Sequence, residues 1–385
     1  MISTRTAIRS ALPFATFLIA VCAINTGAEA QFDSKNKAPL SVKQKKTHAA
    51  KKAKPATKAM RKAEATGPLY ATRPDVLAAA DEIAQRLGLD QQGVRHAIGQ
   101  SHYMPGIARA IAPPPVGTIK NWTVYRRRFI DPIRVRAGVK FWQDNRETLE
   151  RAEQQTGVPA AIIVGIVGVE TIYGQQVGTY RVMDALTTLS FDFPKQHPRA
   201  TARSAFFRSE LESFLALTQR TGTDPLALRG SYAGAMGLPQ FMPSRWSKYA
   251  IDFDGDGRVD LFHSTADVIG SVANYFKAFG WKSGMPTHYS VRLTREGPDR
   301  AALLAPDILP TFTPADMVTR GGELEAAAMQ HTGPLALVEL QNGEAPPLYL
   351  AGTENFYTIT RYNWSSYYAL AVIELGQEVA AAMPK

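Results

Sequence analysis

The chain has 385 residues, of which 45% are hydrophobic and 20% are charged, and its formal net charge is +10 at pH 7. This composition excludes a globally disordered protein and suits two or three domains with a substantial core. The single cysteine, Cys22, lies near the N-terminus. The body of the chain is therefore expected to have neither a disulfide nor a thiol catalyst.

Residues 1–30 have the order of a secretory signal peptide. Arg5 and Arg9 precede the apolar stretch 11–24, which is followed by the small-residue sequence Ala-Glu-Ala ending at Ala30. The apolar stretch is shorter than the roughly 20 residues of a membrane-spanning helix. We therefore expect export to the periplasm and cleavage after Ala30.

A lipid anchor on Cys22 is the alternative for this segment. Ile19 and Ala20 precede the cysteine, but Val21 is bulkier than the small residue that normally stands directly before a lipidated cysteine. The sequence therefore favours a cleaved signal peptide over an outer-membrane lipoprotein.

The positive charge is concentrated in the next segment, residues 31–66. Residues 35–63 contain eleven Lys or Arg and no acid, and the rest of the chain is nearly neutral. A segment rich in Lys, Ala and Pro buries too little apolar surface to fold alone, which predicts a disordered linker. The simpler interpretation is a solvated spacer; the alternative is salt-sensitive attachment to an anionic envelope surface. Nucleic acid is not an expected partner of an exported protein.

Helical periodicity begins at about Arg73. Apolar residues recur there at three- and four-residue spacing, namely Val76, Leu77, Ala80, Ile83, Ala84 and Leu87. The proline-rich stretch 113–117 predicts a loop, residues 122–130 suggest another helix, and helix is expected again from about 134 to 156. Residues 67–150 are thus expected to form an N-terminal helical domain.

The catalytic core is expected within residues 151–284. Pro159 suits the first turn of a helix, and residues 160–169 are apolar on every side, so this helix must be buried. Residues 285–350 contain several prolines and alternating apolar positions, which predicts a small β-rich insertion. Residues 351–385 return to helical spacing and are expected to complete a groove beside the core.

Glu170 is the sharpest chemical feature, because this carboxylate stands at the end of the apolar helix in the sequence Val-Glu-Thr-Ile-Tyr-Gly. A buried charge is costly unless it has a task or a partner. Desolvation favours the neutral acid, so the group can stay protonated near neutral pH and serve as a general acid. The structural alternative is a carboxylate paired with an arginine in the core.

Residues 230–244 read Gly-Ser-Tyr-Ala-Gly-Ala-Met-Gly-Leu-Pro-Gln-Phe-Met-Pro-Ser, and their small side chains let the backbone approach a ligand closely. Ser231 and Gln240 add hydrogen-bonding groups. With Glu170 before it and Asn-Tyr-Phe at 274–276 after it, this segment resembles the lytic transglycosylases of the membrane-bound lytic murein transglycosylase B family and its soluble relatives. The resemblance extends over most of the chain, to a Thr-Arg-Tyr-Asn motif near its end.

The resemblance implies a mainly α fold, with a lysozyme-like catalytic core, a flanking helical domain and the small β-rich insertion. It also implies non-hydrolytic cleavage of the β-1,4 bond between N-acetylmuramic acid and N-acetylglucosamine, which leaves a 1,6-anhydro ring. Most glycosidases need two carboxylates, whereas here Glu170 would act as acid and then as base toward the 6-hydroxyl of the sugar.

Further substrate contacts also follow from the resemblance. Ser231 and Gln240 would hold groups near the scissile bond, and the glycan groove would be lined by Tyr125, Tyr275, Tyr362, Asn363 and Tyr368. One departure is that Leu238 and Pro239 stand where some members have Tyr-Gly, which could reshape that wall of the groove.

Residues 252–260 have the opening pattern of an EF-hand calcium loop, with aspartates at loop positions one, three, five and nine and glycine at six. His263 occupies position twelve, where an EF-hand needs a bidentate glutamate, so the standard loop is broken. The resemblance suggests a longer loop, 252–267, closed by a later aspartate. The expected ligands of a structural Ca²⁺ are therefore Asp252, Asp254, Asp256, the Arg258 carbonyl and Asp267.

Two other functions are compatible with parts of the sequence. A hydrolytic muramidase would need a second carboxylate to activate water, for which Asp184 and Asp192 are nearby in sequence. A catalytically silent peptidoglycan-binding scaffold would be expected to lack the glutamate, yet Glu170 is present. We expect a monomeric enzyme that acts on peptidoglycan glycan strands without an organic cofactor.

Overall fold

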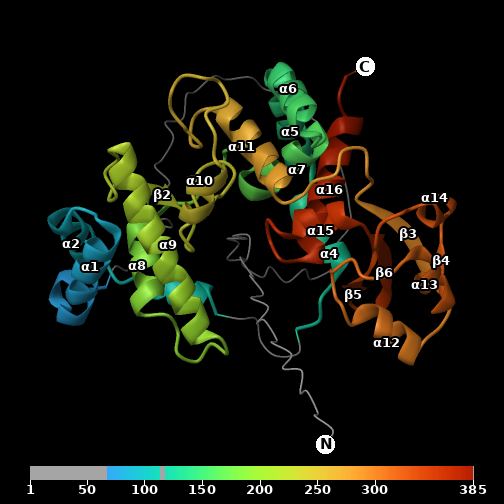
Figure 1. Cartoon of the computed structure of the whole chain (residues 1–385), viewed down its shortest axis with the longest axis horizontal. Coiled ribbons are helices and arrows are strands. Elements are labelled where there is room, and N and C mark those ends of the chain that lie inside the picture. Colours follow the sequence, from blue (N-terminus) through green and yellow to red (C-terminus); the bar gives the residue numbers. More distant parts are fainter. Residues whose placement is uncertain (1–66, 113–117, 385) are drawn as a thin grey trace, which may run out of the picture.

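The computed structural model describes residues 67–112 and 118–384, and the fold is mainly helical with small sheets, as expected (Figure 1). The signal peptide, Cys22, the basic linker and the loop 113–117 lie outside these residues. In the described part of the chain no single helix is long and apolar enough to cross a membrane. One bent pair, α6 (Arg146–Thr156) with α7 (Ala160–Thr171), passes the same test of length and composition.

One group of helices forms the left side of the molecule in Figure 1. Its helices share one hydrophobic cluster with residues of the 232–242 segment. Their bounds are α1 Pro74–Leu87, α2 Gln91–Gly99, α3 Pro105–Ala110, α8 Val182–Phe191 and α9 Ala200–Thr221, preceded by the short 3-10 turn Tyr70–Thr72. The expected helix from about Arg73 is α1, which starts with Pro74 and ends at Gly88 in the left-handed conformation.

The second and largest group packs around α7, Ala160–Thr171, which is buried along nearly its whole length as its apolar sequence predicts. The other helices of this group are α4 Trp122–Phe129, α5 Pro132–Asp144, α6 Arg146–Thr156, α11 Thr265–Ala278, α15 Glu354–Thr360 and α16 Ser366–Ala381. Helix α10, Pro243–Tyr249, packs on α9 of the first group and on α11 of the second. Helices α7 and α16 approach closely because of Gly165 and Gly376. A Cβ atom at either glycine would collide with a carbonyl oxygen of the other helix.

The helix expected from about 134 to 156 is in fact two helices. Asn145 ends α5 and precedes α6, with φ −124° and ψ 22°, and its side-chain amide donates to Phe141 O at 2.8 Å. Hydrophobic spacing continues across this break, so periodicity alone does not reveal it. Pro159 likewise precedes α7 as its N-cap rather than lying in the first turn.

Residues 285–352 contain a four-stranded antiparallel sheet with the order β4-β3-β6-β5, on the right in Figure 1. The strands are β3 His288–Leu293, β4 Gly322–Leu324, β5 Ala336–Asn342 and β6 Ala345–Gly352, and the short helices are α12 Pro298–Leu304, α13 Pro314–Thr319 and α14 Ala326–Met329. A small hydrophobic cluster of its own stabilises this part. The domain boundaries drawn from the sequence stay predictions.

Candidate active site and acidic loop

Glu170 lies in the last turn of α7, where the backbone makes an unusual turn. Ile172 and Tyr173, directly after the helix, both have left-handed φ angles, 50° and 54°, which are strained for residues other than glycine. The turn sends the ring of Tyr173 back over α7 and α5, where Gly168 and Gly138 leave space; a Cβ atom at either glycine would overlap the Tyr173 hydroxyl. The Tyr-Gly sequence after Glu170 therefore shapes the end of the helix.

Glu170 is a half-buried residue, and its carboxyl group accepts a hydrogen bond from the Tyr368 hydroxyl at 2.6 Å. Burial raises the pKa of Glu170 to about 7, while the Tyr368 hydrogen bond and the positive charge of Arg245 act in the opposite direction. No other carboxylate of the described residues acts on this pKa. Glu170 is thus a lone carboxyl group that can both donate and accept a proton near neutral pH.

Three of the four predicted groove tyrosines form one buried aromatic group, and Tyr368 joins this group to the carboxyl of Glu170. The rings of Tyr362 and Tyr368 are nearly parallel, with centroids 6.4 Å apart, and Tyr275 lies edge-on to Tyr362 at 4.9 Å. The Tyr275 hydroxyl donates to Arg361 O at 2.6 Å. Because these rings are 2% exposed or less, in this conformation they support Glu170 rather than offering a free face to a sugar.

Tyr125 and Asn363 have different surroundings. Tyr125 on α4 is half-buried, and burial together with the charge of Glu170 raises its pKa well above the usual range. It also lines a cavity of about 410 Å³ with Tyr367, Trp364, Lys120 and others. Asn363 is 7% exposed and follows Tyr362 in the loop before α16. Tyr125 is therefore a predicted groove residue that lines an open cavity.

Ser231 and Gln240 lie at the two ends of a tight loop that begins after β2, Arg229–Gly230, which pairs with β1, Tyr180–Arg181. The Ser231 hydroxyl accepts hydrogen bonds from Ala233 N at 3.3 Å and Ala235 N at 3.0 Å, so its own proton stays available as a donor. The Gln240 amide nitrogen donates to Gly237 O at 2.9 Å and Val177 O at 3.2 Å. A substrate hydroxyl or N–H would accordingly be bound by its amide oxygen.

Leu238 and Pro239, which stand where some members of the family have Tyr-Gly, are held by hydrogen bonds to the two sides of the site. Thr171, next to Glu170, donates its hydroxyl to Leu238 O at 2.9 Å. The Tyr362 hydroxyl donates to Pro239 O. Main-chain carbonyls make these contacts, so they do not require a particular side chain at either position.

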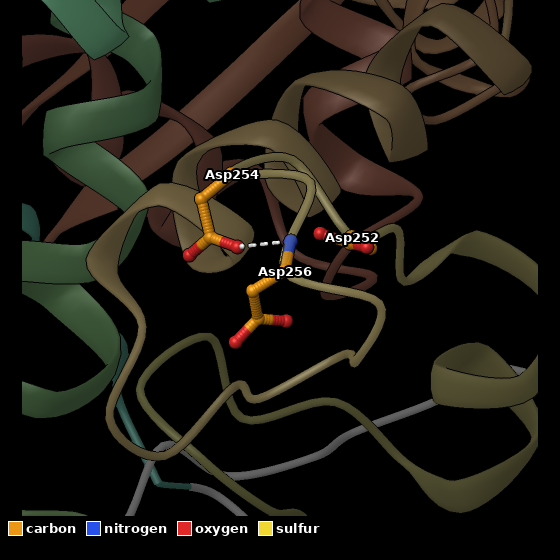
Figure 2. A group of neighbouring side chains, drawn as sticks. All are labelled: Asp252, Asp254 and Asp256. Atoms are coloured by element: carbon orange, nitrogen blue, oxygen red, sulfur yellow. Dashed lines mark hydrogen bonds between the residues drawn. The ribbon is translucent and has the colours of Figure 1, made fainter.

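The acidic loop lies between α10 and α11 and has three exposed carboxylates. Atoms of Asp252, Asp254 and Asp256 that could ligate a metal all lie within 4.8 Å of one another (Figure 2). Asp252 accepts from Gly255 N at 2.6 Å and from Gly257 N at 2.8 Å, and both glycines have left-handed φ angles. Asp254 also accepts a hydrogen bond from the Ser264 hydroxyl at 2.6 Å, so the loop is folded around its own carboxylates.

Asp267, the predicted closing ligand, lies at the start of α11 and is 1% exposed. Its carboxylate oxygens accept hydrogen bonds from Phe253 N and Asp260 N, both at 2.7 Å. These bonds join the first and last parts of the loop. Asp267 is not one of the three clustered carboxylates, and its role as a ligand stays a prediction.

Comparison with known proteins places this arrangement in a family. Residues 72–377 match the family of the transglycosylase SLT domain. The chain belongs to this transglycosylase family. The family assignment agrees with the resemblance seen in the motifs around Glu170 and residues 230–244.

Three relatives illustrate the closeness of the transglycosylase match. The chain is 40% identical over 329 residues to the membrane-bound lytic murein transglycosylase B of Escherichia coli K12, covering 81% of this chain and 84% of the relative. The structure of the soluble lytic transglycosylase SltB1 from Pseudomonas aeruginosa matches with a TM-score of 0.72 and 40% identity, over 80% of this chain and 99% of that one. The Escherichia coli lytic transglycosylase Slt35 in complex with calcium matches with a TM-score of 0.71 and 39% identity, over 82% and 96% of the chains.

Two residues of this transglycosylase site were missed by sequence reasoning. Thr171 was read only as part of a motif, although its hydroxyl joins the end of α7 to the 230–244 segment. Arg245 was not singled out at all, because one arginine in a short helix carries no recognisable pattern. Its position depends on tertiary packing that spacing alone does not reveal.

Proposed function

We propose that the chain is a lytic murein transglycosylase in which Glu170 cleaves the β-1,4 bond between N-acetylmuramic acid and N-acetylglucosamine. The observation that supports this function most directly is the lone carboxyl group of Glu170. Burial raises its pKa to about 7, and it accepts a 2.6 Å hydrogen bond from Tyr368. A group titrating near the working pH is suited to donate a proton and then to recover one. Membership of the transglycosylase family supports the same activity.

In the first step, protonated Glu170 gives its proton to the glycosidic oxygen, and the bond from that oxygen to C1 of the muramic residue breaks. In the second step, ionised Glu170 removes the proton from the 6-hydroxyl of the same sugar, and the 6-oxygen bonds to C1. Glu170 ends protonated, no water is consumed, and the product carries a 1,6-anhydro ring. Tyr368 stabilises the ionised intermediate state of Glu170 because it donates a hydrogen bond to the carboxylate.

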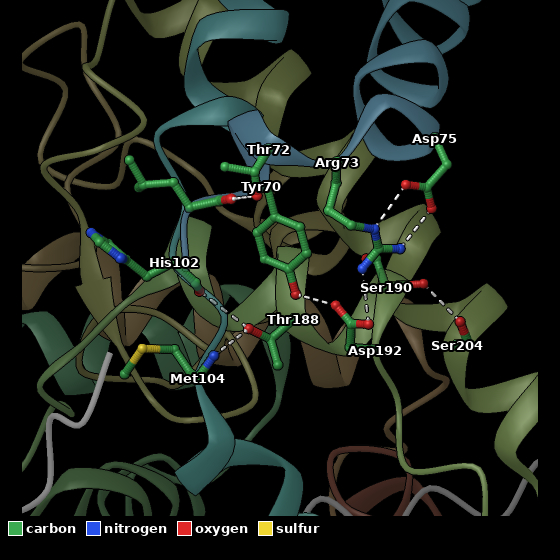
Figure 3. A network of polar contacts seen from close by, with 11 residues as sticks. Tyr70, Thr72, Arg73, Asp75, His102, Met104, Thr188, Ser190, Asp192 and Ser204 are labelled. Atoms are coloured by element: carbon green, nitrogen blue, oxygen red, sulfur yellow. Dashed lines mark hydrogen bonds and ion pairs between the residues drawn. The ribbon is translucent and has the colours of Figure 1, made fainter. Parts of the chain in front are cut away.

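The hydrolytic alternative needs a second carboxylate near the scissile bond. Asp192 accepts hydrogen bonds from the Tyr70 hydroxyl at 2.6 Å and from Arg73 at 3.2 Å (Figure 3). Asp184 is 6% exposed and is bound by Arg181 at 2.6 Å and by His102 N at 2.9 Å. Both candidates are therefore engaged in contacts that join α8 to the N-terminal helices. This supports a reaction in which Glu170 is the one catalytic carboxylate.

Substrate binding is assigned on the same basis. Ser231 would donate its hydroxyl proton and Gln240 would offer its amide oxygen to acetamido or hydroxyl groups of the sugars. Tyr125, in the cavity of about 410 Å³, would support a sugar ring, since aromatic faces pack on the apolar faces of sugars. Tyr275, Tyr362, Asn363 and Tyr368 would shape the wall of the groove behind Glu170.

A structural Ca²⁺ in the acidic loop is part of the proposal. Asp252, Asp254 and Asp256 fit this ion, because their carboxylate oxygens are the hard ligands that Ca²⁺ takes and they lie within reach of a common centre. The Arg258 carbonyl and Asp267 are further proposed ligands. The ion would offset the repulsion between the three carboxylates and stabilise the loop; it would take no part in bond cleavage.

The location of the enzyme follows from the N-terminal sequence and from its substrate. A cleaved signal peptide at residues 1–30 would release it into the periplasm, where residues 31–66 would act as a basic linker, able to contact an anionic envelope surface. Peptidoglycan is reached from that compartment. A lipid anchor on Cys22 remains the less favoured alternative.

Mass spectrometry of the muropeptides released from purified sacculi tests the proposed reaction. The protein beginning at residue 31 should release products with 1,6-anhydro-muramic ends, and the Glu170→Gln variant should release none. Reducing muramic ends would identify a hydrolase instead. An absence of products from the unmutated protein would favour the binding scaffold.

A further inference from the structure

Arg245 is the cation that acts on Glu170. It lies in α10 and is half-buried. Its guanidinium donates to Tyr362 O at 2.8 Å and to Arg361 O at 3.3 Å. The guanidinium carbon also lies 5.5 Å from the ring centroid of Tyr275 and 5.8 Å from that of Tyr362. Arg245 is therefore fixed behind the aromatic group that surrounds Glu170.

The positive charge of Arg245 is not neutralised by a direct partner. Both of its hydrogen bonds go to main-chain carbonyls, and across residues 67–112 and 118–384 no carboxylate forms an ion pair with it. Its positive charge acts on two carboxyl groups with which it forms no ion pair: it opposes the rise that burial causes in the pKa of Glu170 and in that of Glu210 on α9. The sequence left open that Glu170 forms an ion pair with an arginine in the core. Arg245 does not form that ion pair, because it and Glu170 are not in contact.

The start of α10 is held by a buried carboxylate of α9. Glu210 is 3% exposed, and its two oxygens accept hydrogen bonds from Ser244 N at 2.9 Å and Ser244 Oγ at 2.7 Å. Ser244 directly precedes Arg245, so these bonds fix the position from which the arginine side chain extends. The contacts continue from Arg245 through the stacked rings of Tyr362 and Tyr368 to the Glu170 carboxyl group.

We propose that Arg245 is a positioning residue that balances the protonated and ionised forms of Glu170, so that one carboxyl group serves first as acid and then as base. This inference rests on the catalytic role proposed for Glu170. It goes beyond the motifs of the sequence, none of which includes Arg245.

The other groups that face Glu170 are neutral at neutral pH. They are the phenols of Tyr125 on α4, Tyr362 after α15 and Tyr368 on α16, whose pKa values are all raised by burial. A cation of a neighbouring element, Arg134 on α5, donates to Gly168 O of α7 at 3.3 Å, and Arg245 is the cation that opposes the rise in the pKa of Glu170. Its cation favours the carboxylate and opposes the effect of burial, which keeps the proton from being held too tightly for its donation to the glycosidic oxygen in the first step.

The test compares Arg245→Gln, which keeps a hydrogen-bond donor but loses the charge, with Arg245→Lys, which keeps the charge. The measurement is kcat against pH on purified glycan strands. Removal of a nearby cation raises the pKa of a carboxyl group, so the limb of the profile set by Glu170 should move to higher pH by roughly one unit in Arg245→Gln. It should stay close to the wild-type position in Arg245→Lys. Lys248→Met removes an exposed charge from the same helix and should leave the profile unchanged.

Several outcomes would overturn the inference. Equal loss of kcat at every pH in Arg245→Gln would indicate a structural role only. If that variant does not fold, a limb displaced to higher pH in Arg245→Lys would still contradict the proposal, because the charge is retained. Glu170→Gln is measured in parallel. If this variant is active, the proposed function itself is refuted. If it is inactive and the kcat–pH profile of Arg245→Gln is not shifted, the role of Arg245 alone is refuted.

Discussion

The end of α7 and the loop at residues 252–256 both present acidic side chains, in opposite surroundings. Glu170 is a lone carboxyl group among aromatic rings, and burial raises its pKa to about 7. The three loop aspartates are exposed and accept hydrogen bonds from backbone N–H groups of their own loop. Hydrogen bonding, first of all from Ser264, lowers the pKa of Asp254. The same functional group is therefore kept able to hold a proton in one region and kept ionised in the other.

This difference matches two kinds of chemistry. A proton donor needs surroundings in which the neutral acid is favoured, whereas a site for a hard cation needs ionised oxygens that already converge. Exchanging the two environments would remove both functions, because an ionised Glu170 could not protonate a leaving group and protonated aspartates would bind a cation poorly. The predictions below test the two regions separately and then compare them.

Glu170→Gln should have the largest effect. The amide keeps the shape of the side chain but has no transferable proton, so kcat should fall by roughly 10² to 10⁴ fold. Release of anhydro-muropeptides from sacculi measures the rate, and circular dichroism checks the fold. A rate above one tenth of the wild-type value would rule out Glu170 as the proton donor.

Asp254→Asn should remove most of the stabilisation by calcium. At a calcium concentration about 100 times Kd, binding to the native state adds about 2.7 kcal/mol, seen as a higher Tm in calcium than in chelator. Asp299→Asn, which removes an exposed carboxylate from α12, should keep the full increment. An equal increment in both variants would show that the cation binds elsewhere.

The sequence predicted both regions for a physical reason. The apolar residues of α7 and the repeated aspartates of the loop are local patterns, and each restricts the surroundings of its carboxylates without reference to the rest of the chain. The mainly helical fold followed in the same way from apolar spacing, as in α1 and α16.

Features that depend on distant contacts were not predictable. Tyr275 and Tyr362 were assigned to a sugar-binding groove, yet their position behind Glu170 depends on how α11 and α15 pack, which spacing does not show. The position of Arg245 depends on tertiary contacts, among them the hydrogen bonds by which Glu210 on α9 holds Ser244. The break at Asn145 leaves the hydrophobic pattern intact, so the division into α5 and α6 was missed.

Tyr368→Phe should have a smaller effect on the first region. Its hydroxyl stabilises the ionised form of Glu170, so its loss should raise the pKa of Glu170 by about one unit, equivalent to about 1.4 kcal/mol. The limb of the kcat profile set by Glu170 should move to higher pH by the same amount. Tyr289→Phe, in the β-rich part, is the matched control and should leave the profile in place. An unchanged profile in Tyr368→Phe would contradict the coupling.

The smallest expected effect concerns stability, and it contrasts the two regions directly. The pKa of Glu170 is raised in the folded chain to about 7 from 4.5, so the native state holds a proton that the unfolded state releases between these values. Stability from this group is therefore lost as pH rises from 4.5 to 7. Glutamine does not titrate, so the free energy of unfolding of Glu170→Gln relative to the wild type should grow between pH 5 and pH 8. We expect roughly 1 kcal/mol, because the residue is half-buried and solvent screening reduces the effect.

Asp254→Asn, measured in chelator, should show no such growth. The pKa of Asp254 is lowered in the folded chain, so this carboxylate is ionised in both the folded and the unfolded state throughout that pH range. Its removal therefore cannot make the free energy of unfolding depend on pH. Thermal unfolding of both variants and the wild type at pH 5 and pH 8 makes the comparison. If the two variants respond to pH alike, then the apolar surroundings of Glu170 do not hold its proton, and the chemical distinction between the two regions is lost.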